Sequence, residues 1–487
     1  MDDSVVRIRQ GRLRGAPAGY GYRFLAIPYA RPPAETGRFA APEPARPWDG
    51  VRDANTFGAA ALQVERGVSL TRDPHVRGPD CLNLNVFTPA LDAAGLPVLF
   101  WVHGGGFVHG SNASPWYNGA KFARDGVVVV AINYRLGAEG FLLLPGAPPN
   151  RAVLDCVAGL QWVQENIAVF GGDPARVTIA GQSSGAGVCS ALLAVPRARG
   201  LFRGAIFMSG SAGLEMSTQR ATDVATRMAA IAGVELTRHD FERLSDEALL
   251  AAQAEILDAR SQMDKVAALD VSLEGAYLTL APVVDGDVMT ETVLQAASSP
   301  ANKDVTLMVG TTAHEFKMFM LDQDWITPDV LRDALVRSGV RPDLADQYLA
   351  MHSMDNPAET AGQIKTDRGL RVLAHRLLEA WSEAAGTGFG YEFRWAPSDG
   401  EMAGTSVHAV DLPFAFDLLG VEGMEALAGA NPPQELADFM HASFASFVKD
   451  MSPGWPEYRA GERATMVFDL PPRVEYDPAA RELELWG

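Results

Sequence analysis

Short apolar runs separated by turn residues and helical segments mark the first two thirds of the chain. Five of them are VLFWV (98–102), VVVVAINY (127–134), VTIA (177–180), GAIFMSG (204–210) and VTLMVG (305–310). Such runs are typical of strands buried on both faces of a sheet. Helical patterns lie between several of them, for example LDCVAGLQWVQENIAVF (154–170). This alternation predicts an α/β fold with a mostly parallel sheet flanked by helices, whose functional groups gather at the carboxyl ends of the strands.

Two segments interrupt this alternation. Residues 215–265 and 326–385 are rich in helix-forming residues. Ser245 is placed as an N-cap, and Pro328 and Pro342 stand near expected helix starts. Neither segment has the flanking composition of a tethered domain. We therefore expect one domain over residues 1–487, with the two segments as helical insertions that form a cap.

The stretch VTIAGQSSGAGVCSALL (177–193) contains Gly-x-Ser-x-Gly between an expected strand and an expected helix. This pattern is typical of a nucleophile elbow, a sharp turn that needs small residues two positions before and after the serine. Ser183 has Gly181 and Gly185 at those positions, whereas Ser184 has larger neighbours. The bare pattern also arises by chance in glycine-rich chains, so the strand and helix around it carry the argument. Ser183 is therefore the candidate nucleophile.

A second glycine motif follows the expected strand at 98–102. In VLFWVHGGGFVHG (98–110), Gly104 to Gly106 present backbone N–H groups that no side chain obstructs. Such donors can stabilise the oxyanion that forms when an ester carbonyl is attacked, and the residue after the nucleophile supplies a further N–H. That residue is Ser184, so its amide would matter and its hydroxyl would not. A flexible loop or a phosphate-binding loop is the alternative, but the lysine of a phosphate loop is missing.

Composition and charge narrow the function further. The 487 residues carry a formal net charge of −19, which argues against a nucleic-acid partner and against an anionic membrane surface. The first residues lack the apolar core of a secretory signal, and the apolar runs are too short to cross a bilayer. Cys81, Cys156 and Cys189 have no metal or redox spacing. We expect free thiols in a reducing cytoplasm, no metal and no cofactor; the sequence leaves the oligomeric state open.

At this point the chain resembles the type-B carboxylesterase family, which includes the cholinesterases and bacterial p-nitrobenzyl-type esterases. The matching stretches include YRFLAIPYARPP (22–33), PDCLNLNVFTP (79–89), WVHGGGF (101–107), NYRLGAEGFL (133–142), WVQENIAVFGGDPARVTIAGQSSGAG (162–187), FRGAIFMSGSA (202–212), GTTAHE (310–315) and GTSVHAVDLPFAF (404–416). The resemblance implies the α/β-hydrolase fold, a deep active-site gorge and a Ser–Glu–His triad in that chain order.

The resemblance also identifies triad residues that the patterns alone do not select. It implies Ser183 as nucleophile, Glu315 in GTTAHE as acid and His408 in GTSVHAVDLPF as base. An imidazole that titrates near neutrality suits the base, and a buried carboxylate can fix its tautomer. The oxyanion hole is implied at Gly105, Gly106 and the Ser184 amide. His314, beside the acid, is expected to be a loop residue rather than a second base.

The chain departs from the family at several positions. Gln182 and Ser184 stand where the family usually has glutamate and alanine, so a buried negative charge beside the triad is lost. The family's partner cysteine for Cys81 is absent, which favours a bacterial, non-secreted form. Residues 62–80 lack the choline-binding tryptophan of cholinesterases, and Phe316 replaces a glycine after the acid. These departures argue for a general carboxylesterase and against a cholinesterase.

The sequence identifies the residues of the substrate pocket only in part. By family position, Met216, Phe316 and Phe319 are expected to line the gorge, although packing of the helical cap is an equally good interpretation of each. An apolar gorge would favour small-molecule esters with short to medium acyl groups. A related serine hydrolase acting on amides, carbamates, lactones or mycotoxin-type esters remains an alternative. A non-catalytic adhesion-type relative and a lid-gated lipase are less well supported.

Overall fold

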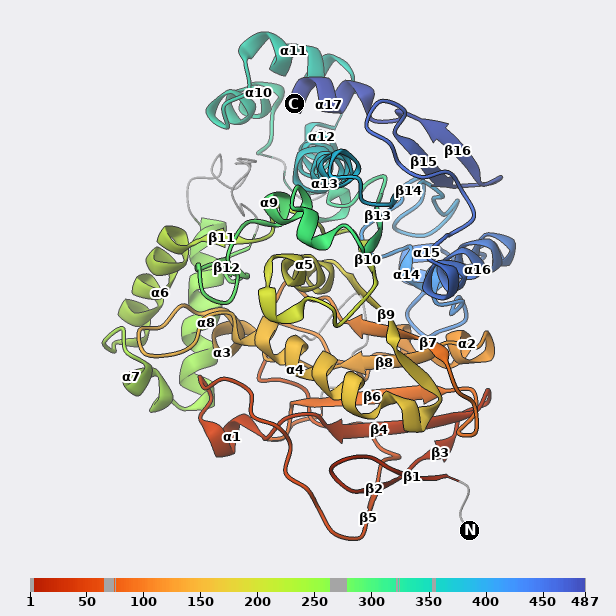
Figure 1. The fold of residues 1–487 in the computed structure, drawn as a ribbon. Helices are drawn as coiled ribbons and strands as arrows, with labels where there is room; N and C mark the ends of the chain where they lie inside the picture. Colours follow the sequence, from red (N-terminus) through yellow and green to blue (C-terminus); the bar gives the residue numbers. More distant parts are fainter. Residues whose placement is uncertain are drawn as a thin grey trace.

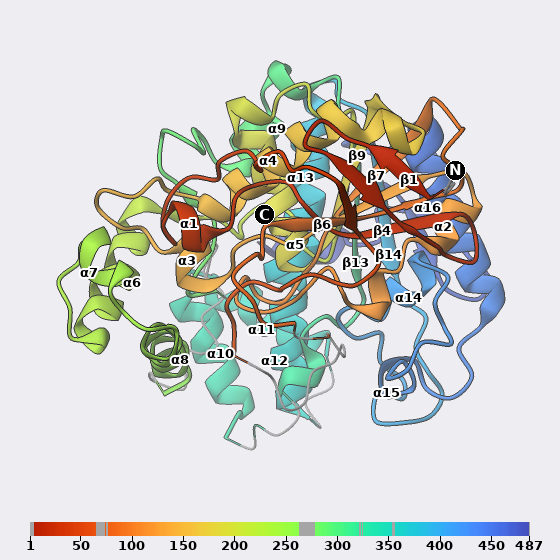
Figure 2. The same ribbon diagram turned by 90° about the horizontal axis from the view of Figure 1, so that it is seen from below.

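The centre of the molecule is a mixed sheet, shown in Figures 1 and 2. The computed structural model describes residues 4–64, 74, 76–262, 278–320, 323, 325–352 and 356–486. The strands of this sheet are β3 (Ala16–Pro17), β4 (Tyr22–Pro28), β6 (Asn83–Thr88), β7 (Leu96–Val102), β8 (Val128–Ile132), β9 (Gly172–Gln182), β10 (Gly204–Met208), β13 (Thr306–Thr312), β14 (Gly388–Phe393), β15 (Ala464–Phe468) and β16 (Arg473–Tyr476).

The strand order within the sheet is β16-β15-β14-β13-β10-β9-β7-β8-β6-β4-β3. The block from β15 to β8 is parallel throughout, and the strands outside it pair antiparallel. The five apolar runs singled out in the sequence form β7, β8, β9, β10 and β13. The predicted α/β fold with a mostly parallel sheet is confirmed. Because β9, β10 and β13 are neighbours, the segments that follow them meet at one edge.

Alternate residues of the central strands enter two separate hydrophobic clusters. In β7, Val98, Phe100 and Val102 belong to one cluster, whereas Leu99 and Trp101 belong to the other. Successive side chains of a strand point to opposite faces, so both faces of this strand are covered. This explains why the strands are continuous apolar runs in the sequence instead of alternating apolar and polar residues.

Helices cover both faces of the sheet. The first face is covered by α4 (Arg151–Asn166), α5 (Ser184–Ala191) and α13 (Val372–Glu383), whose apolar residues join the cluster of Val98. The second face is covered by α2 (Ala120–Arg124) and α16 (Gln434–Asp450), whose apolar residues join the cluster of Leu99. In Figure 1, α4 and α5 lie in front of the sheet.

The first helical segment contains α6 (Thr218–Ala232), α7 (Arg238–Glu242) and α8 (Asp246–Gln262), which gather at one side of the molecule in Figure 1. The Ser245 hydroxyl accepts a hydrogen bond from the Ala248 amide at 3.2 Å, as expected of an N-cap. The end of the segment, 263–265, lies outside the described residues. Whether these helices act as a cap stays a prediction.

The second helical segment contains α10 (Pro328–Arg337), α11 (Pro342–Ala350) and α12 (Pro357–Thr366). The first two begin at the predicted prolines. Together with α17 (Ala480–Trp486), the three helices form a third hydrophobic cluster, separate from the two that cover the sheet. The last helix of the predicted segment, α13, contacts β13 and β14 and forms the crossover between these parallel strands.

The remaining strands are β1 (Val5–Arg7), β2 (Arg12–Arg14) and β5 (Val51–Asp53), which form a small sheet, and the pair β11 (Met216–Ser217) and β12 (Val283–Val284). The remaining α-helices are α1 (Pro33–Thr36), α3 (Gly137–Phe141), α9 (Val293–Ala297), α14 (Leu412–Ala415) and α15 (Glu425–Ala428). Within the described ranges, no helix combines the length and the apolar character that crossing a bilayer requires.

Candidate active site

Ser183 occupies a sharp turn between β9 and α5. Its backbone has φ +57° and ψ −128°, a conformation that non-glycine residues rarely adopt. The turn depends on its two flanking glycines. A Cβ at Gly181 would lie 2.5 Å from the carbonyl carbon of Gly185, and a Cβ at Gly185 would lie 2.2 Å from the carbonyl oxygen of Val102. The strand and the helix therefore approach closely only because both positions are glycine.

The glycine loop after β7 lies against this turn. A Cβ at Gly104 would be 3.2 Å from the Cβ of Ser183. Gly105 and Gly106 have φ +128° and +64°, and around a Cβ at Gly106 no heavy atom of the described residues lies within 4 Å. The loop thus contacts the serine at Gly104 and has open space around Gly106. Ser184 is the first residue of α5, so its N–H has no intrahelical acceptor.

His103 holds the start of the glycine loop. Its ring is buried and stacks on Tyr134, with ring centroids 4.6 Å apart, and its Nδ1 donates to the Gly104 carbonyl at 2.9 Å. The Tyr134 hydroxyl donates to the His103 carbonyl at 2.8 Å. Burial lowers the pKa of His103 to about 4, so the ring is neutral at physiological pH. His103 therefore has a structural role in the loop.

Glu315 and His408 are in contact although they are far apart in the sequence. Glu315 follows β13 and is fully buried; its Oε1 accepts a hydrogen bond from the Thr312 amide at 2.8 Å. Its Oε2 lies 2.5 Å from Nδ1 of His408. Since a carboxylate only accepts, Nδ1 carries the proton, and in the neutral ring Nε2 keeps its lone pair. This is the tautomer that a general base for serine requires.

His314 joins the loops that carry these two residues. Its amide donates to the Ser406 carbonyl at 2.9 Å, and its Nδ1 accepts from the Ser406 amide at 3.0 Å. Burial, together with Lys317 and Arg371, lowers the pKa of His314 to about 4. His314 is therefore a neutral residue that fixes the distance between the two loops, consistent with the expected loop role.

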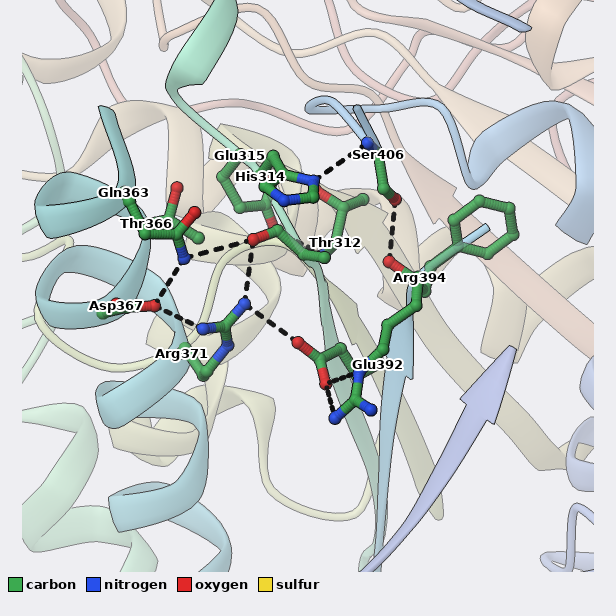
Figure 3. Close-up of polar contacts among 12 residues, drawn as sticks. Thr312, His314, Glu315, Gln363, Thr366, Asp367, Arg371, Glu392, Arg394 and Ser406 are labelled. Carbon is green, nitrogen blue, oxygen red and sulfur yellow. Dashed lines mark hydrogen bonds and ion pairs between the residues drawn. The ribbon is translucent and has the colours of Figure 1, made fainter. Parts of the chain in front are cut away.

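The loop of Glu315 is anchored from α12 and the π-helical turn Asp367–Arg371, as Figure 3 shows. Arg371 donates to the Ala313 carbonyl at 2.9 Å and forms ion pairs with Asp367 and Glu392. On the other side of the acid, the Phe316 amide donates to the Thr366 hydroxyl at 3.2 Å. The backbone on both sides of the acid is thus fixed by buried groups. Such π-turns are frequent near functional sites.

Gln182 and Phe316 contact the imidazole of His408. The side-chain amide of Gln182 lies 3.1 Å from Nε2 of His408, and Gln182 directly precedes Ser183. The Phe316 ring is nearly parallel to the imidazole, with an interplanar angle of 14° and centroids 6.0 Å apart. The Phe319 ring lies 6.2 Å from that of Phe316 and is 51% exposed. Met216, in contrast, is buried in the core cluster of Val98.

A second buried carboxyl, Asp411, lies near the pair. It accepts a hydrogen bond from the Tyr391 hydroxyl at 3.1 Å. Burial and the charge of Glu315 raise the pKa of Asp411 to about 7. Neither this residue nor the Gln182–His408 contact follows from the sequence patterns described above. The available signal was the spacing HAVD, which places an acidic residue three positions after the histidine and just before α14.

The site contains no candidate metal centre within the described residues, where no cluster of three or more histidine, cysteine or acidic side chains has the required arrangement. All three cysteines are buried and free. The polar groups brought together here are a serine on a strained turn, an imidazole oriented by a carboxylate, and a glycine loop. These are the components of acyl transfer by a serine nucleophile.

Comparisons with known proteins agree with this geometry. The profile of the Carboxylesterase family matches residues 2–486. The para-nitrobenzyl esterase of Bacillus subtilis (strain 168) is 31% identical over 99% of this chain and 98% of its own. The phenmedipham hydrolase of Pseudarthrobacter oxydans is 32% identical over 95% and 94%. A crystal structure of a Geobacillus stearothermophilus carboxylesterase superposes with a TM-score of 0.87 at 34% identity, covering 99% and 100% of the two chains. The chain belongs to the carboxylesterase family, has its α/β-hydrolase fold and is a carboxylic ester hydrolase.

Proposed function

We propose that Ser183, Glu315 and His408 form the catalytic triad of this esterase, with the N–H groups of Gly105, Gly106 and Ser184 as the oxyanion hole. The observation that carries this proposal is the 2.5 Å contact between Glu315 and Nδ1 of His408, which orients the ring so that Nε2 lies beside the Ser183 turn.

The proposed reaction has two halves. Ser183 Oγ attacks the ester carbonyl carbon while Nε2 of His408 takes the hydroxyl proton, and the amides of the oxyanion hole bind the negative oxygen. The C–O bond of the ester then breaks, and the alcohol leaves with that proton. In the second half, water attacks the acyl-enzyme, gives its proton to His408, and the acid is released as the proton returns to Ser183. No redox or metal step is needed to balance either half.

The side chains beside the base favour a small ester with an aromatic or alkyl group as the substrate class. The Phe316 ring lies nearly parallel to the imidazole of the base, and the exposed Phe319 ring lies next to that of Phe316. Aromatic rings offset from one another add about 0.5–1.5 kcal/mol to contact with an aryl group. A role for Met216 in substrate binding receives less support, because this side chain is buried in the core.

The location of the enzyme in the cytoplasm stays a prediction.

Amides, carbamates, lactones and mycotoxin-type esters remain alternative substrates, since the same acyl-enzyme chemistry cleaves them all. A panel of p-nitrophenyl esters of increasing acyl length, set beside an anilide, a carbamate and a lactone, distinguishes these classes. We expect the highest kcat/KM for a short or medium acyl ester. A higher value for a charged or polymeric ester, or for an amide, would contradict the proposed substrate class.

The two adjacent serines provide the test of the nucleophile. We expect Ser183→Ala to lower kcat by about 10⁴-fold or more. Ser184→Ala keeps the backbone N–H, so most of the activity should remain. Labelling with an organophosphonate and mass spectrometry of the digest should place the adduct on Ser183. Full activity of Ser183→Ala, or an adduct on another residue, would disprove the assignment.

A further inference from the structure

The contact between Gln182 and His408 has a direction that follows from the proton on Nδ1. In the neutral ring Nδ1 carries the proton and Nε2 has a lone pair, so Gln182 presents its NH₂ group and acts as donor. Gln182 is only 4% exposed. Its Oε1 lies toward the glycine loop, 3.0 Å from the position of a Cβ at Gly104. The side chain is therefore held between the loop and the imidazole.

This contact occupies the atom that has to accept the Ser183 proton. An imidazole nitrogen has one in-plane lone pair, so it cannot receive full hydrogen bonds from both an amide and a hydroxyl. Within the described part of the chain, Gln182 contacts Nε2, and the Ser183 hydroxyl makes no hydrogen bond to it. In the empty site the base is thus held by the residue before the nucleophile, and the hydroxyl must replace the amide when a substrate binds.

We propose that Gln182 is a positioning residue that holds the neutral imidazole of His408 in the empty site and yields Nε2 to Ser183 during attack. Because Gln182 donates to Nε2, the base stays unprotonated at lower pH than it would with a carboxylate at position 182. The proposal rests on the triad assigned above. A donor to the lone pair stabilises the neutral ring, whereas a carboxylate would accept from a protonated Nε2 and stabilise the charged ring.

The charged and titratable groups that face His408 support this distinction. Glu315 contacts Nδ1, and Asp411 interacts with both Glu315 and His408 from the start of α14. The nearest ring, Phe316, carries no charge. A glutamate at position 182 would add a third carboxyl group to this buried site. Its negative charge would stabilise the positively charged imidazolium form of His408.

The test substitutes Gln182→Glu and follows kcat/KM for a neutral p-nitrophenyl ester against pH. We expect the acid limb of the profile to move to higher pH by about one unit, which is a roughly tenfold loss at the acid end. Gln164→Glu is the matched control, because Gln164 lies on α4 and donates to the Pro174 and Leu201 carbonyls away from the site. This control should leave the limb in place.

A measurement that does not use activity separates this proposal from the triad assignment. The downfield proton resonance of the His408 Nδ1–H reports protonation of the ring. We expect it to titrate at the same pH in wild type and in Ser183→Ala, and at higher pH in Gln182→Glu. A shift in Ser183→Ala as large as that in Gln182→Glu would show that Ser183 holds Nε2, and an unchanged titration in Gln182→Glu would overturn the proposal. If Gln182→Glu does not fold, Gln182→Met, which cannot donate to Nε2, replaces it: we expect the ring to titrate at higher pH than in wild type, and an unchanged titration would overturn the proposal.

Discussion

Asp411 is the residue in the active site whose burial has the clearest energetic consequence. Its pKa is raised from 3.8 to about 7, first by burial and then by the charge of Glu315. Between about pH 4 and pH 7 the folded protein therefore holds a proton that the unfolded chain has released. Stability falls as the pH rises through this window. Each pH unit corresponds to about 1.4 kcal/mol for a single group.

We predict that Asp411→Asn increases the free energy of unfolding relative to wild type, and that the increase is larger at about pH 8 than at about pH 5 by roughly 1–3 kcal/mol. Asparagine removes the charge and retains an oxygen that can accept from the Tyr391 hydroxyl. Urea unfolding at the two pH values measures the difference. Asp346→Asn, on an exposed residue, is the control. A stability difference that does not change with pH would contradict this account of Asp411.

Single residues also mark the limit of prediction from this sequence. The turn at Ser183 and the glycine loop follow from local patterns, because short-range backbone sterics determine both. Glu315 and His408 are 93 residues apart, and no local property distinguishes them from the other acidic residues and histidines. They were identified through family resemblance. The Gln182–His408 contact could not be predicted at all, because it depends on a side-chain distance that only the folded chain determines.

At the scale of elements, the turn between β9 and α5 depends on Gly185. A methyl group there would lie 2.2 Å from the Val102 carbonyl oxygen and 2.5 Å from that of His103. These atoms belong to β7 and to the glycine loop, so relief of the clash must move the nucleophile turn away from the oxyanion hole. Overpacking of this kind costs about 1–3 kcal/mol in stability. The larger effect is on the alignment of Ser183 with the loop.

We predict that Gly185→Ala lowers kcat/KM by about a hundredfold, since a displacement of about 1 Å in a catalytic group has that effect. Gly420→Ala is the matched control, because around a Cβ at Gly420 no heavy atom of the described residues lies within 4 Å and no positive φ is involved. Steady-state kinetics with one p-nitrophenyl ester compares the two variants. Equal activity of both would mean that the turn tolerates a side chain and that the close approach has no catalytic role.

The elements themselves were predictable where their patterns are long. Five strands of the parallel block were found because burial on both faces makes them continuously apolar, as Val98 to Val102 in β7 illustrate. The short strands β1, β2 and β5, which form the small separate sheet, have no such run. The helical segment 326–385 shows a further limit. Helical periodicity indicates a helix in α13 but does not reveal that this helix crosses between β13 and β14 while α10 to α12 form a separate cluster.

At the scale of the whole molecule, a buried ion pair joins segments that are far apart in the sequence. Arg135 and Asp155 are fully buried, and Arg135 Nη2 donates to Asp155 Oδ1 at 2.6 Å. Nη1 of Arg135 also donates to the carbonyls of Ala40 at 2.6 Å and Arg38 at 3.2 Å. The pair therefore connects the loop after α1, the segment after β8 and helix α4. Its loss would leave an uncompensated charge in the core.

We predict that Asp155→Asn destabilises the protein by about 3–5 kcal/mol, because removal of one partner of a buried pair leaves the other unpaired in a medium that cannot solvate it. A chain of this size is prone to irreversible unfolding, so the half-time of thermal inactivation is measured together with urea unfolding. Asp346→Asn breaks the exposed pair with Arg332, whose members are 55% and 42% accessible, and should change stability by less than about 1 kcal/mol. An equal loss of stability in both variants would contradict this prediction. It would mean that water reaches Asp155 and that the ion pair does not connect α4 rigidly to the segment after β8.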